Sequence, residues 1–120
     1  MIKNQNSKRY DLEDRTLEFG KQIIRLGKDL PKDTINFNLL DQVIRSGLSM
    51  GANYREANET ETKKDFQFRI RICRKEGKET IYWLQLIIEA NPEFRDRVNP
   101  LIQEATELVK IFAAILEKTK

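Results

Sequence analysis

The sequence predicts an all-α protein, an antiparallel up-down four-helix bundle, and three observations support that prediction. Apolar residues recur three or four positions apart along four segments, and no segment alternates with the period of two that is typical of strands. Only 5 glycines and 3 prolines occur, and 34% of the residues are charged, a composition that favours helices joined by short loops. A chain of 120 residues is long enough for one core. We therefore expect one bundle domain over residues 10–120, preceded by a flexible polar segment, residues 1–9.

The first helix is predicted to follow Asp11, a residue type that caps amino ends, with Glu13 and Asp14 complementing the helix dipole. Pro31 is expected to stop it, because proline cannot continue the hydrogen-bond ladder. The apolar positions are spaced four and three apart, so they form one buried stripe: Leu12, Thr16, Phe19, Ile23, Leu26 and Leu30.

The second helix is predicted to begin with Asn38 as its cap. Gly47 and Gly51 share one face of it, although each glycine costs up to ~1 kcal/mol relative to alanine inside a helix. We expect something to approach that face closely, either a neighbouring helix or a ligand or nucleic acid. The apolar face consists of Leu40, Val43, Ile44, Gly47, Met50, Gly51 and Tyr54. The opposite face is small and polar, and is either shaped for contact or simply exposed: Gln42, Arg45, Ser49, Ala52, Asn53 and Glu56.

The third helix is predicted over residues 63–91, with Thr60 or Thr62 as its cap. Its core stripe is Phe66, Ile70, Cys73, Gly77, Thr80, Leu84 and Ile87. A second apolar group lies a quarter-turn to a third of a turn away and consists of Phe68, Ile72, Trp83 and Leu86. A helix that is apolar on two sides is buried on two sides, so this group predicts a subunit interface. We expect it to meet the small stripe Ser49, Ala52 and Asn53 of another subunit, a heterologous contact that can close a ring.

Asn91 and Pro92 are expected to end the third helix, and Asn99 with Pro100 to open the fourth as cap and first helical residue. The inner stripe of the fourth helix is Leu101, Ala105, Leu108, Phe112 and Ile115, broadened by Ile102, Val109 and Leu116.

Basic residues gather in one sector of the third helix, on the side away from the core stripe: Lys64, Arg71, Arg74, Lys75 and Lys78. Such an array can follow a phosphate backbone, although a solvated face is the commoner explanation. It lacks exposed aromatic residues for stacking bases, unless Phe68 or Tyr82 serves that purpose.

Charged residues also interrupt the apolar stripes of the third helix at Arg69, Glu76 and Glu79. Buried charges need partners, and the second helix offers Asn53, Arg55 and Glu56. These residues predict a polar network that fixes the helix register. The same groups are the only candidates for an active site.

Several classes of function are excluded or disfavoured. The chain has no histidine and a single cysteine, Cys73, so we expect no zinc site, no catalytic nucleophile, no disulfide and no cofactor. Its longest apolar run, residues 111–116, is far too short to span a membrane, and no signal peptide is recognisable at the amino end. A net charge of +3 and a pI near 9.0 permit nucleic-acid partners without requiring them. We expect a cytoplasmic protein.

A family resemblance emerges from several runs of this sequence. They are Gln42-Val43-Ile44-Arg45-Ser46, Ser49-Met50-Gly51-Ala52-Asn53, Glu56-Ala57, Lys63-Lys64-Asp65-Phe66 and Lys75-Glu76-Gly77-Lys78-Glu79-Thr80-Ile81-Tyr82-Trp83-Leu84. They resemble the four-helix bundle proteins encoded in intervening sequences of bacterial 23S ribosomal RNA genes, some of which are labelled ribosomal proteins. The resemblance covers residues 11–116. The chain departs from the common pattern after Asn53, where Tyr54 and then Arg55-Glu56-Ala57 replace Ile and then Ala-Glu-Gly.

The resemblance implies a ring-like homo-oligomer, most often a pentamer, and a similarity to the accessory proteins of diversity-generating retroelements, which bind reverse transcriptase and nucleic acid. It implies no enzymatic activity. The leading hypothesis is a non-enzymatic oligomer that binds RNA or a nucleic-acid-processing protein, because a basic sector repeated around a ring gains avidity. The alternative is a protein–protein adaptor or structural oligomer without nucleic-acid binding. A third hypothesis is an enzyme that uses Glu56 with Arg69 or Glu76.

Overall fold

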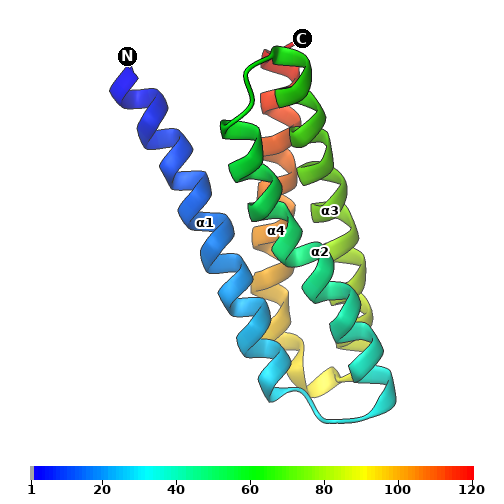
Figure 1. Cartoon of the computed structure of the whole chain (residues 1–120). Helices are drawn as coiled ribbons and strands as arrows, with labels where there is room; N and C mark the ends of the chain where they lie inside the picture. Colours follow the sequence, from blue (N-terminus) through cyan, green and yellow to red (C-terminus); the bar gives the residue numbers. More distant parts are fainter. Residues whose placement is uncertain (1) are drawn as a thin grey trace.

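Short connections join four long helices: α1 (Ile2–Asp29), α2 (Thr34–Asn58), α3 (Lys63–Ala90) and α4 (Arg95–Lys118), with one 3₁₀ turn, η1 (Pro92–Phe94), before α4. This computed structural model describes residues 2–120, with side chains from residue 11 onward, and that part of the chain contains no strand. Neighbouring helices run antiparallel (Figure 1), which confirms the predicted bundle. Met1 and the side chains of residues 2–10 lie outside the described residues, so the flexibility expected for residues 1–9 stays a prediction.

The helices form a ring in the order α1, α2, α3, α4, so that α1 and α3 occupy diagonal positions, and their Cα atoms do not come within 8 Å of each other. Helix α2 packs extensively on α3, and α3 on α4, whereas α1 packs on α2 and only slightly on α4. Figure 1 shows α1 leaning away from the other three helices towards its amino end. One side of α1 and α2 is therefore less covered than the rest of the bundle.

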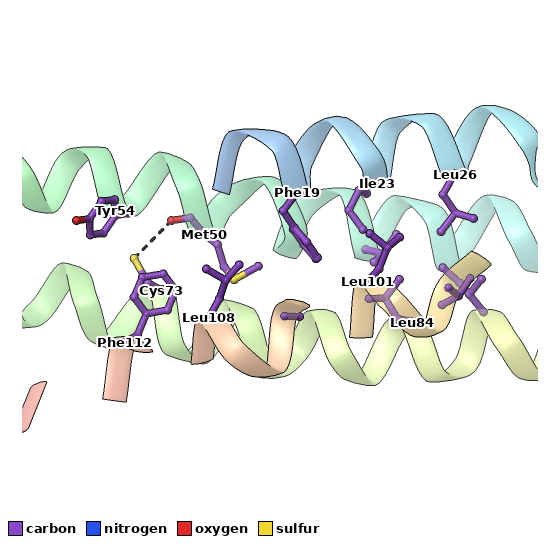
Figure 2. Packing of buried hydrophobic residues seen from close by; sticks show 14 of the residues in the cluster. Phe19, Ile23, Leu26, Met50, Tyr54, Cys73, Leu84, Leu101, Leu108 and Phe112 are labelled. Atoms are coloured by element: carbon purple, nitrogen blue, oxygen red, sulfur yellow. Dashed lines mark hydrogen bonds between the residues drawn. The ribbon is translucent and has the colours of Figure 1, made fainter. Parts of the chain in front are cut away.

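The predicted stripes meet in the centre of the bundle. Phe19 and Ile23 of α1, Met50 of α2, Leu84 of α3 and Phe112 of α4 are all at most 2% exposed, and Figure 2 shows them pointing into the space between the helices at successive levels along the bundle. Phe66 and Ile115 are the stripe residues of α3 and α4 that remain partly exposed. Every residue predicted for the stripe of α1 is buried.

Glycines allow this close approach, as the sequence predicted. A Cβ atom added at Gly77 would lie 2.6 Å from Cγ2 of Val109, and one at Gly51 would lie 3.0 Å from the hydroxyl of Thr16. A Cβ at Gly47 would lie 3.3 Å from Cγ1 of Ile23. Gly47 and Gly51 thus allow α2 to pack closely against α1. Of the two explanations considered for these glycines, the structure supports a neighbouring helix and not a ligand or nucleic acid.

Three predicted helix starts are wrong. Helix α1 already runs from Ile2, so Asp11 caps nothing. Helix α2 begins one turn before Asn38, because the side chain of Asp33 accepts a hydrogen bond from the backbone N–H of Asn36 at 2.8 Å. The carboxyl ends of α1 and α3, before Pro31 and Pro92, lie within a residue or two of the predicted positions.

Helix α4 begins at Arg95, so Pro100 lies inside it and Asn99 is not its cap. The extra turn is stabilised by tertiary contacts: Val98 is fully buried, and Arg97 forms an ion pair with Asp29 of α1 at 2.7 Å. Helix α3 is capped by Thr62, whose side chain accepts from the backbone N–H of Asp65 at 3.1 Å.

A buried amide pair joins the ends of α2 and α3. The side-chain N–H of Asn36 donates to Asn91 at 2.9 Å, and that of Asn91 donates back to Asn36 at 2.7 Å. Both residues are at most 3% exposed. The sequence marks Asn91 only as a helix end, because nothing in it links two asparagines 55 positions apart.

Candidate nucleic-acid and subunit interfaces

The basic sector lies on the outer side of α3. Lys64, Arg71, Lys75 and Lys78 are exposed, and Arg74 is half-buried. Lys64, Arg71 and Lys78 follow one another at intervals of seven residues, which keeps them on one side of a helix with 3.6 residues per turn. The acidic residues of the same stretch, Asp65, Glu76 and Glu79, lie beside this sector and not within it, and Glu79 borders it because it follows Lys75 by four residues.

Most cations of this sector have no partner among the described side chains. Among the described side chains, no ion pair or hydrogen bond is formed by Lys64, Arg71, Arg74 or Lys78. Lys75 is the exception and pairs with Glu76 and Glu79 at 3.8 Å each. Six arginines elsewhere do have side-chain partners: Arg15, Arg25, Arg45, Arg55, Arg69 and Arg97. The sector therefore keeps positive charge that the protein itself does not neutralise.

Aromatic side chains border the basic sector. Tyr82 is 56% exposed, lies one turn after Lys78, and stands edge-on to Trp83 with ring centres 5.0 Å apart. Phe68 is also 56% exposed, and the guanidinium of Arg69 lies 5.9 Å from its ring centre. Both aromatic residues considered for base stacking are thus accessible at the surface.

The polar network between α2 and α3 is smaller than predicted. Arg69 donates to the side-chain oxygen of Asn53 at 3.0 Å, and the amide of Asn53 donates to the hydroxyl of Ser49 at 2.9 Å. Arg55 instead pairs with Glu13 of α1 at 3.6 Å. Asn53 and Arg69 are therefore brought together, while Arg55 and Glu76 have other partners.

No catalytic constellation forms among the described residues. Glu56 is exposed and has no hydrogen bond or ion pair with Arg69 or Glu76. Burial raises the pKa of the Glu76 carboxyl, and Glu79 raises it further, while Lys75 opposes the shift. The described chain has no cluster of histidine, cysteine, aspartate and glutamate that would hold a metal ion.

Cys73 is a core residue, as predicted. It is fully buried, and its thiol lies 3.5 Å from the carbonyl oxygen of Met50 (Figure 2). Burial raises the pKa of the thiol to about 12. The reactive thiolate is therefore scarce at neutral pH.

The predicted subunit-contact residues have mixed exposure. On α3, Phe68 is exposed and Ile72 and Leu86 are half-buried, whereas Trp83 packs partly against the core. On α2, Ala52 is exposed, but Ser49 and Asn53 are occupied by the network with Arg69. The sequence missed a second apolar surface, a groove between α1 and α2, because its walls come from two helices. None of the helices in the described chain is long and apolar enough to cross a membrane.

Comparisons with known proteins agree on one family. A family model described as 23S rRNA-intervening sequence protein matches residues 8–114. The crystal structure of a protein with unknown function from the S23 ribosomal protein family, from Bacteroides thetaiotaomicron, superposes with a TM-score of 0.83. The two sequences are 34% identical, and the match covers 92% of this chain and 98% of the other. No curated protein matches the chain.

Proposed function

The chain belongs to the 23S rRNA-intervening sequence protein family, and we propose that it is a non-enzymatic homo-oligomer that binds RNA through the outer side of α3. The sector Lys64, Arg71, Arg74, Lys75 and Lys78 contacts the phosphates, and Tyr82 stacks on a base. A pentamer, the assembly that the family resemblance implies, would repeat this sector five times. The matched crystal structure is of a protein with unknown function, so the proposal rests on the chemistry of the surface.

The proposal rests on the positive charge of the basic sector, which other side chains of the protein do not neutralise. Arg71, Arg74, Lys64 and Lys78 have no partner among the described side chains, whereas six other arginines do. Each cation that neutralises a phosphate releases a counterion, and an exposed aromatic residue adds about 1–3 kcal/mol per stacked base. One such sector binds weakly, but sectors linked in a ring gain avidity without any new contact.

The test replaces Arg71, Arg74 and Lys78 together by glutamine and follows the binding of a fluorescein-labelled single-stranded RNA by anisotropy at several salt concentrations. The slope of log affinity against log salt is about −0.7 per phosphate contact on a single strand, so losing three contacts flattens it by about 2 for each bound sector. The matched control is Lys28→Gln, Lys110→Gln and Lys118→Gln, which removes the same charge elsewhere. Equal affinities and slopes for both triple variants overturn the RNA proposal.

A protein–protein adaptor is the second candidate. Ile35 and Phe37 are 63% and 77% exposed in the first turn of α2, and Phe37 lines a cavity of about 440 Å³. Exposed apolar residues of this size are typical of contact sites. If the natural chain binds no RNA and a charged replacement of Phe37 abolishes capture of a cellular protein, the adaptor replaces the RNA proposal.

A further inference from the structure

The outer face between α1 and α2 carries an apolar groove. Of the seven large apolar side chains that are exposed on the described surface, three line this one groove: Leu17 at 47%, Ile24 at 43% and Leu48 at 36%. The groove encloses about 250 Å³, and its lining includes Gly20, Gly51 and Ala52, which have little or no side chain. A concentration of exposed apolar surface around a hollow is typical of a docking site.

Gly20 gives a second, independent indication that the groove is kept open. A Cβ atom there would meet only Leu48, at 3.7 Å, which is ordinary van der Waals contact. By contrast, a Cβ at Gly77 or Gly27 would come within 2.7 Å of a neighbouring side chain. Glycine inside a helix costs up to ~1 kcal/mol relative to alanine, and packing within this chain does not require it at position 20. The missing methyl group instead deepens the groove.

Charge complementarity identifies the occupant. Two cations line the groove: Lys21, which forms no ion pair or hydrogen bond among the described side chains and only lies near the Glu18 carboxylate, and Arg55, which is half-exposed and pairs with Glu13. A matching ridge therefore needs apolar side chains flanked by carboxylates. The face of α3 next to the basic sector offers both, since Phe68 is 56% exposed and Asp65 and Glu79 are exposed beside it.

We propose that this groove receives a ridge of α3, formed by Phe68 and Ile72, from a second copy of the chain, with Lys21 and Arg55 facing the second copy's Asp65 and Glu79. The inference rests on the proposed homo-oligomer and specifies its contact. Helices α1 and α3 occupy diagonal positions in the bundle, so the groove and the ridge of one copy belong to different sides of the molecule. The contact is therefore heterologous, and each copy uses its groove for one neighbour and its ridge for the other.

A complementation experiment tests this contact. One variant carries Leu17→Glu and Ile24→Glu in the groove, and the other carries Phe68→Glu in the ridge. Each alone is expected to stay monomeric by light scattering at concentrations about 100-fold above those at which the natural chain assembles. An equimolar mixture is expected to give a 1:1 dimer and nothing larger, because the intact ridge of the first variant fits the intact groove of the second. Lys110→Glu, an exposed change on α4, is the control and assembles normally.

Circular dichroism verifies that each variant stays helical. Should the double groove variant unfold, Ala52→Leu fills the groove with a helix-forming apolar side chain and is expected to block assembly in the same way. A monomeric natural chain overturns both the homo-oligomer and this contact. A natural oligomer that the groove variants leave intact overturns the contact alone and leaves the homo-oligomer standing. Monomeric variants whose mixture stays monomeric overturn the pairing of groove and ridge.

Discussion

Helix α2 is packed in two different ways on its two sides. Towards α3, the contact is closed: Met50 and Cys73 are fully buried, and the hydroxyl of Thr80 lies 2.9 Å from that of Ser46. Towards the outer side of α1, apolar residues stay exposed around a groove whose depth depends on Gly20. The difference indicates that the first contact serves the stability of one chain, whereas the second is incomplete until another molecule covers it.

The largest expected difference concerns two isoleucines. Ile70 on α3 is fully buried, so Ile70→Ala is expected to lower the free energy of unfolding by roughly 2–5 kcal/mol through lost burial and a cavity. Ile24 on α1 is 43% exposed, and Ile24→Ala is expected to cost less than about 1 kcal/mol. Urea denaturation at a concentration where the chain is monomeric measures both. Similar losses would show that the outer face belongs to the core.

Two glycines are expected to respond with opposite sign. Gly77→Ala forces a methyl group to within 2.6 Å of Val109 and is expected to destabilise the monomer by about 1–3 kcal/mol through overpacking. Gly20→Ala has room and is expected to stabilise the monomer by up to ~1 kcal/mol while weakening assembly. Urea denaturation and light scattering on the same samples separate the two effects. A destabilised Gly20→Ala monomer would remove the argument that the groove is held open.

The closed contact is also expected to protect Cys73. Its pKa is about 12 because of burial, so a bulky disulfide reagent should label it at least ~100-fold more slowly in the native protein than in urea at pH 8. The sign of the pH dependence follows, because above pH 9 the unfolded chain loses a proton that the folded chain retains. Cys73→Ala should therefore reduce the loss of stability between about pH 9 and pH 12. Fast native labelling would show that α2 and α3 open readily.

The smallest effect is expected where α1 is attached by charge. Arg15 donates twice to the carboxylate of Glu104 on α4, at 3.0 and 2.8 Å, and both side chains are about one-third exposed. Arg15→Gln is expected to cost no more than about 1 kcal/mol, and the difference should shrink in 1 M salt. The urea midpoint in low and high salt measures it. A larger, salt-independent loss would mean that α1 is attached as firmly as α3.

The buried stripes were predictable from the sequence because they repeat with the helical period, and the structure buries Phe19, Ile70 and Phe112 as expected. Helix starts were less predictable, because several residues of capping type compete. Asp33, and not Asn38, caps α2. Helix α4 begins at Arg95, before Pro100, and its added turn is held by the buried side chain of Val98. Contacts with other parts of the chain determine where these two helices begin, and the local sequence pattern does not contain them.

The surface sites also differ in how far the sequence could predict them. The basic sector and Phe68 lie on a single helix, so spacing alone placed them correctly on the exterior of α3. The groove was missed because Leu17 and Ile24 lie on α1 while Leu48 lies on α2, and each alone looks like a stray apolar residue. Only the packing of the two helices brings them together.

A cross-linking measurement tests most directly whether the outer face of α1 and α2 is a subunit surface. Ile24→Cys and Phe68→Cys are introduced together, with Cys73→Ala, and the oxidised protein is separated under non-reducing conditions. A disulfide within one chain is not expected, because the Cα atoms of α1 and α3 stay more than 8 Å apart, beyond the reach of a disulfide. We expect covalent oligomers for the double cysteine variant, monomers for each single cysteine variant, and only dimers for a mixture of the two single variants. Cross-linking within a single cysteine variant, or no cross-linking at concentrations where the natural chain assembles, would contradict this expectation.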